Sequence, residues 1–181
     1  ELMAYVNFST GYKGGGINPR PFIPSQVVPF RPERVNAYEV GFKSDLFDRA
    51  LRLNVSAFLN KYRDVILIDG NGFPGKADIK GIEVEATLKP TEGFDISGSV
   101  SYLHFKYKTL DANAVASGIG LDFVPPFTPE WKWSIAASYR AELGNGATIT
   151  PQFDIDSMSD VYTDPANRSF NHLDGRTVVN A

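Results

Sequence analysis

The chain contains no cysteine, so disulfide bridges, thiolate metal sites and cysteine nucleophiles are excluded. Long apolar runs are also missing: the stretches 65–68 and 134–137 fall far short of the ~20 residues that a membrane-spanning helix requires. This second absence does not exclude a membrane β-barrel, whose strands are apolar only at alternate positions. Basic residues are not in excess, since the net charge is −3. The charge balance therefore argues against nucleic acid as a partner.

Glycine, proline and aromatic residues are frequent, with 16 Gly, 12 Pro and 13% aromatics, as in a β protein with many turns. The connections between predicted strands alternate between short and long. Short connections are expected at 44–50, 90–93 and 142–146, and long ones at 13–34, 69–75, 108–130 and 159–174. Membrane barrels show this pattern, because their periplasmic turns are tight and their outer loops are long.

Each predicted strand places apolar residues on one face and polar residues on the other, because successive side chains point in opposite directions. In the segment 51–60, Leu51 and Leu53 share one face and Arg52 and Asn54 the other. Seven segments alternate in this way, and an eighth begins near 177–181. Pro151 interrupts the seventh, where we expect a bulge or an unpaired position. We predict an all-β, antiparallel up-and-down transmembrane β-barrel, of which residues 1–181 supply one partial wall of about eight strands.

Strand length and aromatic placement favour a membrane barrel over a soluble β fold. The alternating stretches approach the 9–11 residues of a tilted membrane strand, whereas soluble strands average ~5–6 residues. Aromatic residues are predicted at the long-loop ends of the strands (Tyr12, Tyr38, Tyr62, Tyr102, Tyr107, Trp131 and Trp133) and at the short-turn ends (Phe42, Phe47, Phe94 and Tyr139). Two such belts fit the interfacial girdles of outer-membrane barrels. In a soluble β fold the same residues would be core.

Five segments, in this order, resemble the TonB-dependent outer-membrane receptors: 5–18, 32–44 (with Pro-Glu, Tyr-Glu and Gly-Phe-Lys), 51–64, 80–85 (Lys-Gly-Ile-Glu-Val-Glu) and 126–131. The resemblance implies a Gram-negative outer-membrane barrel of about 22 strands, with its lumen plugged by an N-terminal domain. It also implies uptake of a scarce nutrient, most often a ferric siderophore and otherwise cobalamin, haem or a glycan, powered through TonB. Both ends of the chain fall inside predicted strands, so we expect a barrel fragment without plug or TonB box.

Charged residues of both signs lie on the polar face of the predicted strands. An Arg or Lys facing lipid at mid-bilayer would cost ~2–4 kcal/mol, so these residues are expected to face the lumen. There they would pair with one another or with the plug. The residues are Glu39, Lys43, Arg52, Glu83, Glu85, Asp95, Lys132 and Arg140.

Candidate ligand contacts lie in or near the long loops, because loops carry recognition in such proteins. Aromatic and arginine side chains suit an anionic, catecholate-like iron chelate. The candidates are Arg20, Phe22, Phe105, Tyr107, Arg168 and His172. Asp160 and Asp164, at a predicted loop, are the remaining acidic candidates for calcium, but the spacing of a helix-flanked calcium loop is missing. We predict no metal site and no cofactor.

Other functional classes are weakly supported. The glycines that follow Lys13 lack the helix and the Gly-Lys-Ser/Thr ending of a phosphate loop. His104 and His172, the two histidines, are far apart and have no nucleophile motif nearby, so we predict no enzyme. The Asn167-Arg-Ser triplet is read as a chance glycosylation match. Three alternatives stay open: a complete eight-stranded barrel with a structural or adhesive role, a soluble β-type binding module, and an outer-membrane hydrolase.

Overall fold

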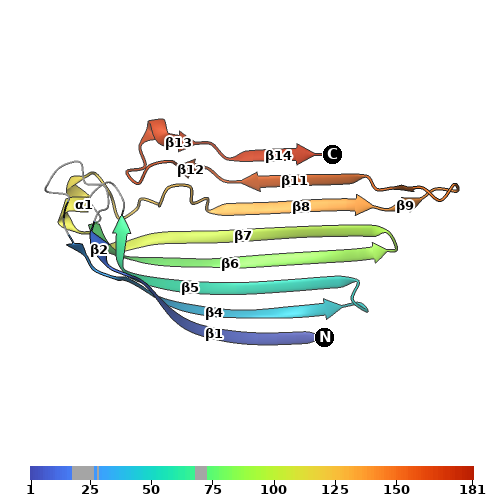
Figure 1. Ribbon diagram of the computed structural model, residues 1–181, viewed down its shortest axis with the longest axis horizontal. Helices are drawn as coiled ribbons and strands as arrows, with labels where there is room; N and C mark the ends of the chain where they lie inside the picture. The colour runs from blue at the N-terminus through green and yellow to red at the C-terminus, as the bar shows by residue number, and fades with distance from the viewer. Residues whose placement is uncertain (18–26, 28, 68–72) are drawn as a thin grey trace.

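The computed structural model describes residues 1–17, 27, 29–67 and 73–181. Its main element is one antiparallel sheet with the order β1-β4-β5-β6-β7-β8-β11-β14, shown in Figure 1. The strands are β1 (Leu2–Lys13), β4 (Glu33–Leu46), β5 (Leu51–Leu67), β6 (Phe73–Thr91), β7 (Phe94–Thr109), β8 (Trp131–Tyr139), β11 (Gln152–Met158) and β14 (Arg176–Asn180).

Smaller elements lie in the connections. Three two-stranded pairs are formed by β2 (Gly16–Ile17) with β3 (Pro29–Phe30), β9 (Ala141–Glu142) with β10 (Thr148–Ile149), and β12 (Val161–Tyr162) with β13 (His172–Leu173). A helix α1 (Ala112–Ala116) and a 3-10 turn (Ser169–Asn171) complete the structure. Within the described residues, no helix combines the length and apolarity needed to cross a membrane.

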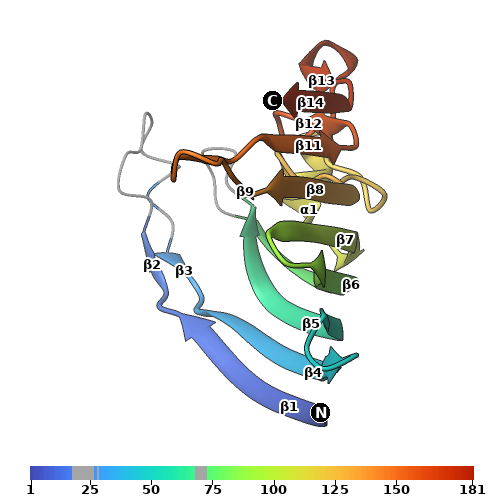
Figure 2. The ribbon, with the colours of Figure 1, turned by 90° about the vertical axis from the view of Figure 1, so that its right-hand side faces the viewer.

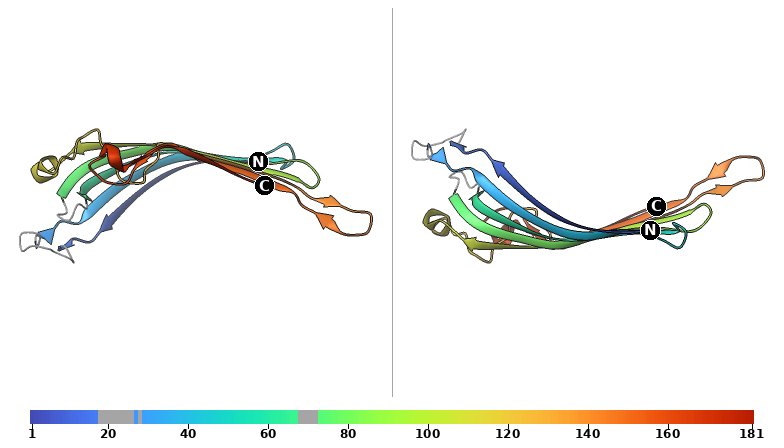
Figure 3. Two further views of the ribbon diagram at one scale, coloured as in Figure 1. Left: turned by 90° about the horizontal axis from the view of Figure 1, so that it is seen from above. Right: turned by 90° about the horizontal axis from the view of Figure 1, so that it is seen from below.

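The sheet is open, with β1 at one edge and β14 at the other. Figure 2 shows that the strands twist and bend along their length, most visibly β1, β4 and β5. Seen from above and below in Figure 3, the sheet forms an arc, with the loops at one end and the β9–β10 hairpin projecting at the other. The fold is thus a partial up-and-down barrel wall, as predicted.

The strand registers confirm the predicted division into two faces, because directly paired residues share a face. One row across β4, β5, β6, β7 and β8 reads Val40, Ala57, Ile82, Tyr102 and Trp131. The next row, on the opposite face, reads Gly41, Ser56, Glu83, Ser101 and Lys132. The apolar face is exposed or half-buried and is not enclosed by other elements of the sheet, with Val6 at 83% and Trp131 at 48% exposed. The inward packing expected of a soluble β module is therefore contradicted.

The short turns fall where the sequence predicts them, at 47–50 and at 92–93. The third short connection differs, because the ladder stops at Tyr139 and resumes at Gln152, and the β9–β10 hairpin continues beyond the sheet. Pro151 lies outside any strand, and its carbonyl accepts a hydrogen bond from the Tyr139 amide at 3.1 Å. The predicted unpaired position is confirmed.

The strands run further toward the long loops than expected. The loop predicted at 69–75 is shorter, since β6 already begins at Phe73. Phe105 and Tyr107 lie inside β7 rather than in a loop. Tyr62 and Tyr107 are also wrongly placed in the outer aromatic belt, because both pair with Ala77 on the polar face. Tyr38, Tyr102 and Trp131 do lie on the apolar face, and the Tyr102 and Trp131 rings are 4.6 Å apart.

The described core is small and lies at the long-loop end. Ala77, Tyr107, Ala114 and Ile119 are buried together, so α1 and its loop pack against β6 and β7. The half-buried hydrophobic residues around this core are Tyr62, Val65, Phe105, Leu110 and Phe123. This packing fixes the base of the long β7–β8 loop on the polar side of the sheet.

Candidate functional site

The polar face of the sheet carries a hollow of about 300 Å³ over β1, β4, β5 and β6. Glu39 and Glu83 line it together with uncharged polar side chains and with Ala37, Tyr38 and Phe58. The Tyr5 hydroxyl donates a 2.5 Å hydrogen bond to the Glu39 carboxylate across the β1–β4 pair. The hollow therefore combines two carboxylates with aromatic rings, and a cross-strand contact holds Glu39 in place.

Two glycines on this face lie under aromatic rings. A Cβ built at Gly41 would meet the Tyr5 ring at 2.7 Å, and one at Gly81 would meet the Phe58 ring at 2.6 Å. Large rings thus cover positions without a side chain, which is a known way to stabilise glycine in a sheet. The Tyr5 and Phe58 rings therefore lie close to the backbone of Gly41 and Gly81.

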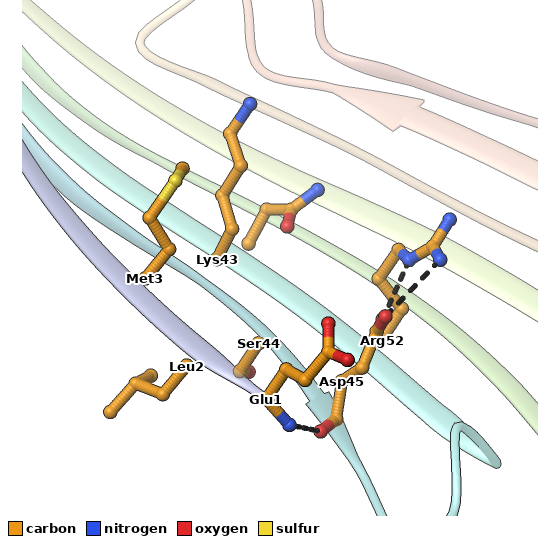
Figure 4. A pocket seen from close by; sticks show the side chains of 8 residues that line it. Glu1, Leu2, Met3, Lys43, Ser44, Asp45 and Arg52 are labelled. Atoms are coloured by element: carbon orange, nitrogen blue, oxygen red, sulfur yellow. Dashed lines mark hydrogen bonds and ion pairs between the residues drawn. The ribbon is translucent and has the colours of Figure 1, made fainter.

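A second hollow, of about 470 Å³, lies at the short-turn end of the same face (Figure 4). Lys43 and Met3 extend to one side of the ribbon, and Leu2 points away from them. Arg52 Nε lies 2.8 Å from Asp45 Oδ1. The Arg52–Asp45 ion pair and the hydrogen bond from the Glu1 amino group to the Asp45 carbonyl lie at this hollow.

The predicted lumen-facing charges share this polar face in the strands that carry them. Lys43 and Glu85 stand in the same row across the sheet, with Asn54 between them, and Glu83 and Lys132 share the next row with Ser101 between them. Asp95 lies 2.8 Å from Lys89 Nζ. Arg140 differs, because it lies between β8 and β9, outside the main ladder. A lumen or plug contact for any of these residues stays a prediction.

At the other end of the sheet, two long loops are joined by Asn167. Its side-chain amide accepts a hydrogen bond from the Val124 amide at 2.8 Å and donates one to the Val124 carbonyl at 2.8 Å. A backbone bond from Phe127 to the Tyr162 carbonyl, at 2.8 Å, lies beside this contact. The β7–β8 loop and the β11–β14 connection therefore form one unit.

The sequence alone did not predict the Asn167 contact. Asn167 has φ of 46°, a left-handed conformation that asparagine tolerates better than most residues. Its place after Asp164-Pro165 is a turn signal, but the partner loop is about 40 residues away and no local pattern identifies it. The structure thus adds a positioning residue for the outer loops.

A pocket of about 290 Å³ lies between β7 and these two loops. His104, Glu130 and Asp160 contribute polar groups, and Phe105 and Tyr162 contribute rings. His104 Nδ1 is 3.7 Å from Glu130 Oε1. Within the described residues, no group of three or more His, Cys, Asp or Glu side chains is arranged to hold a metal ion.

The structure separates the predicted ligand-contact residues. Arg168 and His172 lie in the β11–β14 connection, with Arg168 stacked 6.0 Å from the Phe170 ring. Phe105 lines the pocket, whereas Tyr107 is 2% exposed and is enclosed by the small core. Arg20 and Phe22 fall outside the described residues.

His172 is held by acidic groups on both ring nitrogens. Nε2 lies 2.8 Å from Asp160 Oδ2, and Nδ1 lies 3.6 Å from Asp174 Oδ1. The hydrogen bond from His172 holds the pKa of Asp160 below its usual value. The His172 ring also packs against Tyr162, with centroids 4.9 Å apart. These contacts fix the β12–β13 pair.

The Asp160–His172 contact predicts a pH dependence. Because the folded pKa of Asp160 is lowered, its stabilising contribution is complete above the usual carboxyl value near 4 and is lost as the pH falls through the lowered value. We expect amide protection factors in β12–β13 to fall as the pH drops below about 4. In Asp160→Asn this fall should be absent. An unchanged fall in that variant would contradict the assignment.

Loss of the Asn167 side chain is expected to free the β7–β8 loop. Asn167→Gly keeps the left-handed backbone and removes both hydrogen bonds to Val124, costing about 1–2 kcal/mol of local stability. Asn167→Ala should cost more, because alanine is strained at positive φ. Hydrogen exchange of the Val124 amide measures the loss of local stability in each of the two variants. Asn145→Gly, which loses only a bond from the Ala147 amide in the opposite hairpin, is the control; a Val124 amide that stays protected would contradict the prediction.

Comparison with known proteins agrees with this architecture. A family model described as TonB dependent receptor-like, beta-barrel, matches residues 1–181. The ferric yersiniabactin uptake receptor of Yersinia pestis superposes with a TM-score of 0.83 at 18% identity, over 98% of this chain and 26% of that chain. The ferric preacinetobactin receptor of Acinetobacter baumannii superposes with a TM-score of 0.73 at 21% identity, over 98% and 26%.

The siderophore receptor PiuA of Acinetobacter baumannii gives a TM-score of 0.72 at 18% identity, again over 98% of this chain and 26% of that one. At these identities the likeness shows the fold, and the chain spans about a quarter of the structures that it matches. Receptors of this family are β-barrels of the Gram-negative outer membrane. Since the family model covers all 181 residues, the chain belongs to the TonB-dependent receptor family and forms part of the wall of its outer-membrane barrel.

Proposed function

We propose that residues 1–181 form a wall segment of a receptor that imports a ferric siderophore through the outer membrane with energy from TonB. The observation that carries the proposal is the match, over 98% of the chain, to the barrel of proteins named as siderophore receptors. No bond-making or bond-breaking step is part of the proposal.

The two faces of the sheet have different roles in this proposal. The exposed apolar face, with Val6, Val40 and Val100, contacts lipid, where burial of apolar area is favourable. The polar face lines the lumen and contacts the plug domain of the same receptor. The Arg52–Asp45 pair and the neighbouring Lys43 supply charges for that contact at the short-turn end.

Ligand recognition is assigned to the outer loops that Asn167 joins. Arg168 is about half exposed and lies 3.4 Å from Asp164, and the neighbouring Phe170 ring is 77% exposed. A cation beside an exposed ring suits an anionic, aromatic iron chelate, since arginine pairs with oxyanions and stacks on rings. His172, Phe105 and the residues Arg20 and Phe22 complete the proposed set. Tyr107 contributes by supporting the loop, because its side chain is enclosed.

The test uses the full-length receptor that contains this segment. Iron-limited cells producing it should take up a ferric siderophore, and the purified receptor should bind that chelate. Arg168→Gln should weaken binding of an anionic chelate about tenfold, as expected for one charge-assisted hydrogen bond. Arg49→Gln, which changes an exposed arginine at the opposite end of the sheet, should leave binding unchanged. Uptake of cobalamin, haem or a glycan with no uptake of any ferric chelate would overturn the proposal.

A further inference from the structure

The pairing of β7 with β8 ends before β7 itself does, and the pocket of about 290 Å³ lies at this place. The last paired row joins Tyr102 and Trp131, whereas β7 continues beyond it toward the long loops. One further backbone hydrogen bond, from the Leu103 amide to the Glu130 carbonyl at 2.9 Å, attaches the β7–β8 connection to the strand. The pocket is the space left between β7, this connection and the segment that follows β11.

The pocket is acidic. Asp122 and Glu130 reach it from the β7–β8 connection, and Asp160 reaches it from the segment after β11. Among the described residues that line the pocket, none is a lysine or an arginine. The other polar side chains that line it are His104, Thr128 and Ser159. Three carboxylates from two segments thus place negative charge around a partly enclosed space, where such charge attracts cations.

The contacts of two of these carboxylates fix their positions. Glu130 accepts a hydrogen bond from the Tyr102 hydroxyl and lies 3.7 Å from His104 Nδ1. Asp160 Oδ2 lies 2.8 Å from His172 Nε2. The side chains in these contacts are a phenol and two imidazoles, which are not permanent cations. Glu130 and Asp160 also remain within reach of a solute, since their side chains are 54% and 58% exposed.

Aromatic rings are the second feature of the pocket. Phe105 and Tyr162 both line it. The Phe105 ring packs edge-on against Tyr107 with centroids 4.6 Å apart, and the Tyr162 ring packs against His172 with centroids 4.9 Å apart. Both rings are therefore supported from behind. A ring face attracts a cation, and burial of an apolar stem against rings is favourable.

We propose that this pocket binds an organic cation, an ammonium or guanidinium group on a short apolar stem. The carboxylates of Asp122 and Glu130 accept charge-assisted hydrogen bonds from such a group, and the rings contact its stem. A bare metal ion does not suit the lining, because no group of three or more His, Cys, Asp or Glu in the described part of the chain is arranged to hold one. An anion is repelled by the same carboxylates.

The pocket belongs to the same loop unit as the proposed chelate contacts Arg168 and Phe170. Asn167 joins their segment to Val124, which also lines the pocket. A ferric chelate with a cationic arm supplies the group that the pocket binds, and a free amine in the medium supplies the same chemistry. Only the first of these two sources rests on the proposed transport function.

The test measures binding of butylguanidinium to the full-length receptor in detergent at pH 8 by ligand-observed NMR titration. Butylurea, which has a similar shape and no charge, is the matched probe. Asp122→Asn/Glu130→Gln is expected to weaken binding of butylguanidinium about tenfold. Asp122→Glu/Glu130→Asp should retain binding and shows that the two positions tolerate substitution. Glu92→Gln/Glu142→Gln, which removes two exposed acids at the short-turn end, should leave binding unchanged.

Equal wild-type affinity for butylguanidinium and butylurea would overturn the proposal. So would equal affinity of the wild type and Asp122→Asn/Glu130→Gln for butylguanidinium. A ferric trihydroxamate chelate that ends in an ammonium group, and its N-acetylated form, separate the two sources. Tighter binding of the ammonium form, lost in Asp122→Asn/Glu130→Gln, assigns the pocket to the arm of an imported chelate, and equal binding of both forms assigns it to a free amine. Failure of all ferric chelate uptake with butylguanidinium binding intact would overturn the transport function alone.

Discussion

Replacing Val100 with arginine is expected to lower the free energy of unfolding of the membrane-embedded receptor by about 2–4 kcal/mol. Val100 lies in β7, pairs with Val84 and Trp133, and is 42% exposed on the apolar face. If that face contacts lipid, a guanidinium there must leave water for hydrocarbon. Denaturant titration of the receptor in bilayers measures the change.

The neighbouring residue provides a matched control. Ser99 precedes Val100 on β7, is also exposed, and faces the polar side, where it pairs with Glu85. Ser99→Arg loses the 2.9 Å contact with the Ser134 hydroxyl but places a cation opposite a carboxylate. We expect a cost below about 1 kcal/mol. Equal costs for the two arginine variants would contradict the assignment of the apolar face to lipid.

Replacing Gly81 with alanine is expected to destabilise the receptor by about 1–3 kcal/mol or more, the cost of overpacking. A Cβ at Gly81 would meet the Phe58 ring at 2.6 Å and would also press on the Tyr102 carbonyl oxygen of the neighbouring strand. The ring can turn away, but the carbonyl is fixed by the β6–β7 ladder. Thermal or denaturant unfolding of the full-length receptor measures the loss.

Two further variants separate these contacts. Phe58→Leu combined with Gly81→Ala should recover only part of the stability, because the clash with the Tyr102 carbonyl remains. Gly98→Ala, in the neighbouring strand β7, is the control, since a Cβ at Gly98 would lie 3.3 Å from its nearest atom, the Ser134 carbonyl oxygen, and little must move. A Gly81→Ala variant as stable as Gly98→Ala would show that β6 and β7 are further apart than described.

The sheet was predictable because its sequence pattern has a single physical cause. Period-two alternation in segments such as 51–60 sets which side chains share a face, and any slip by one residue would exchange the faces. In the observed register Val55 pairs with Val84 on the apolar face and Asn54 pairs with Glu85 on the polar face, so the two faces stay separate. Pro151 could be placed for a similar reason, since it lacks the amide donor that a ladder position needs.

The loop end could not be predicted in the same way. Tyr107 looked like a belt or ligand residue, but α1 and Ile119 cover it, and that packing depends on a loop without periodicity. The Asn167–Val124 contact joins segments that no local pattern links.

The most direct test of the account is a spin-label scan of positions 96–101 in the full-length receptor in its membrane. This chain contributes no cysteine of its own, so single cysteines can be introduced along β7 one at a time. The account predicts that labels at Ile96, Gly98 and Val100 collide with oxygen dissolved in lipid, and that labels at Ser97 and Ser99 collide with a water-soluble nickel complex. Accessibility that does not alternate with a period of two would contradict a barrel wall with one lipid-facing and one lumen-facing side.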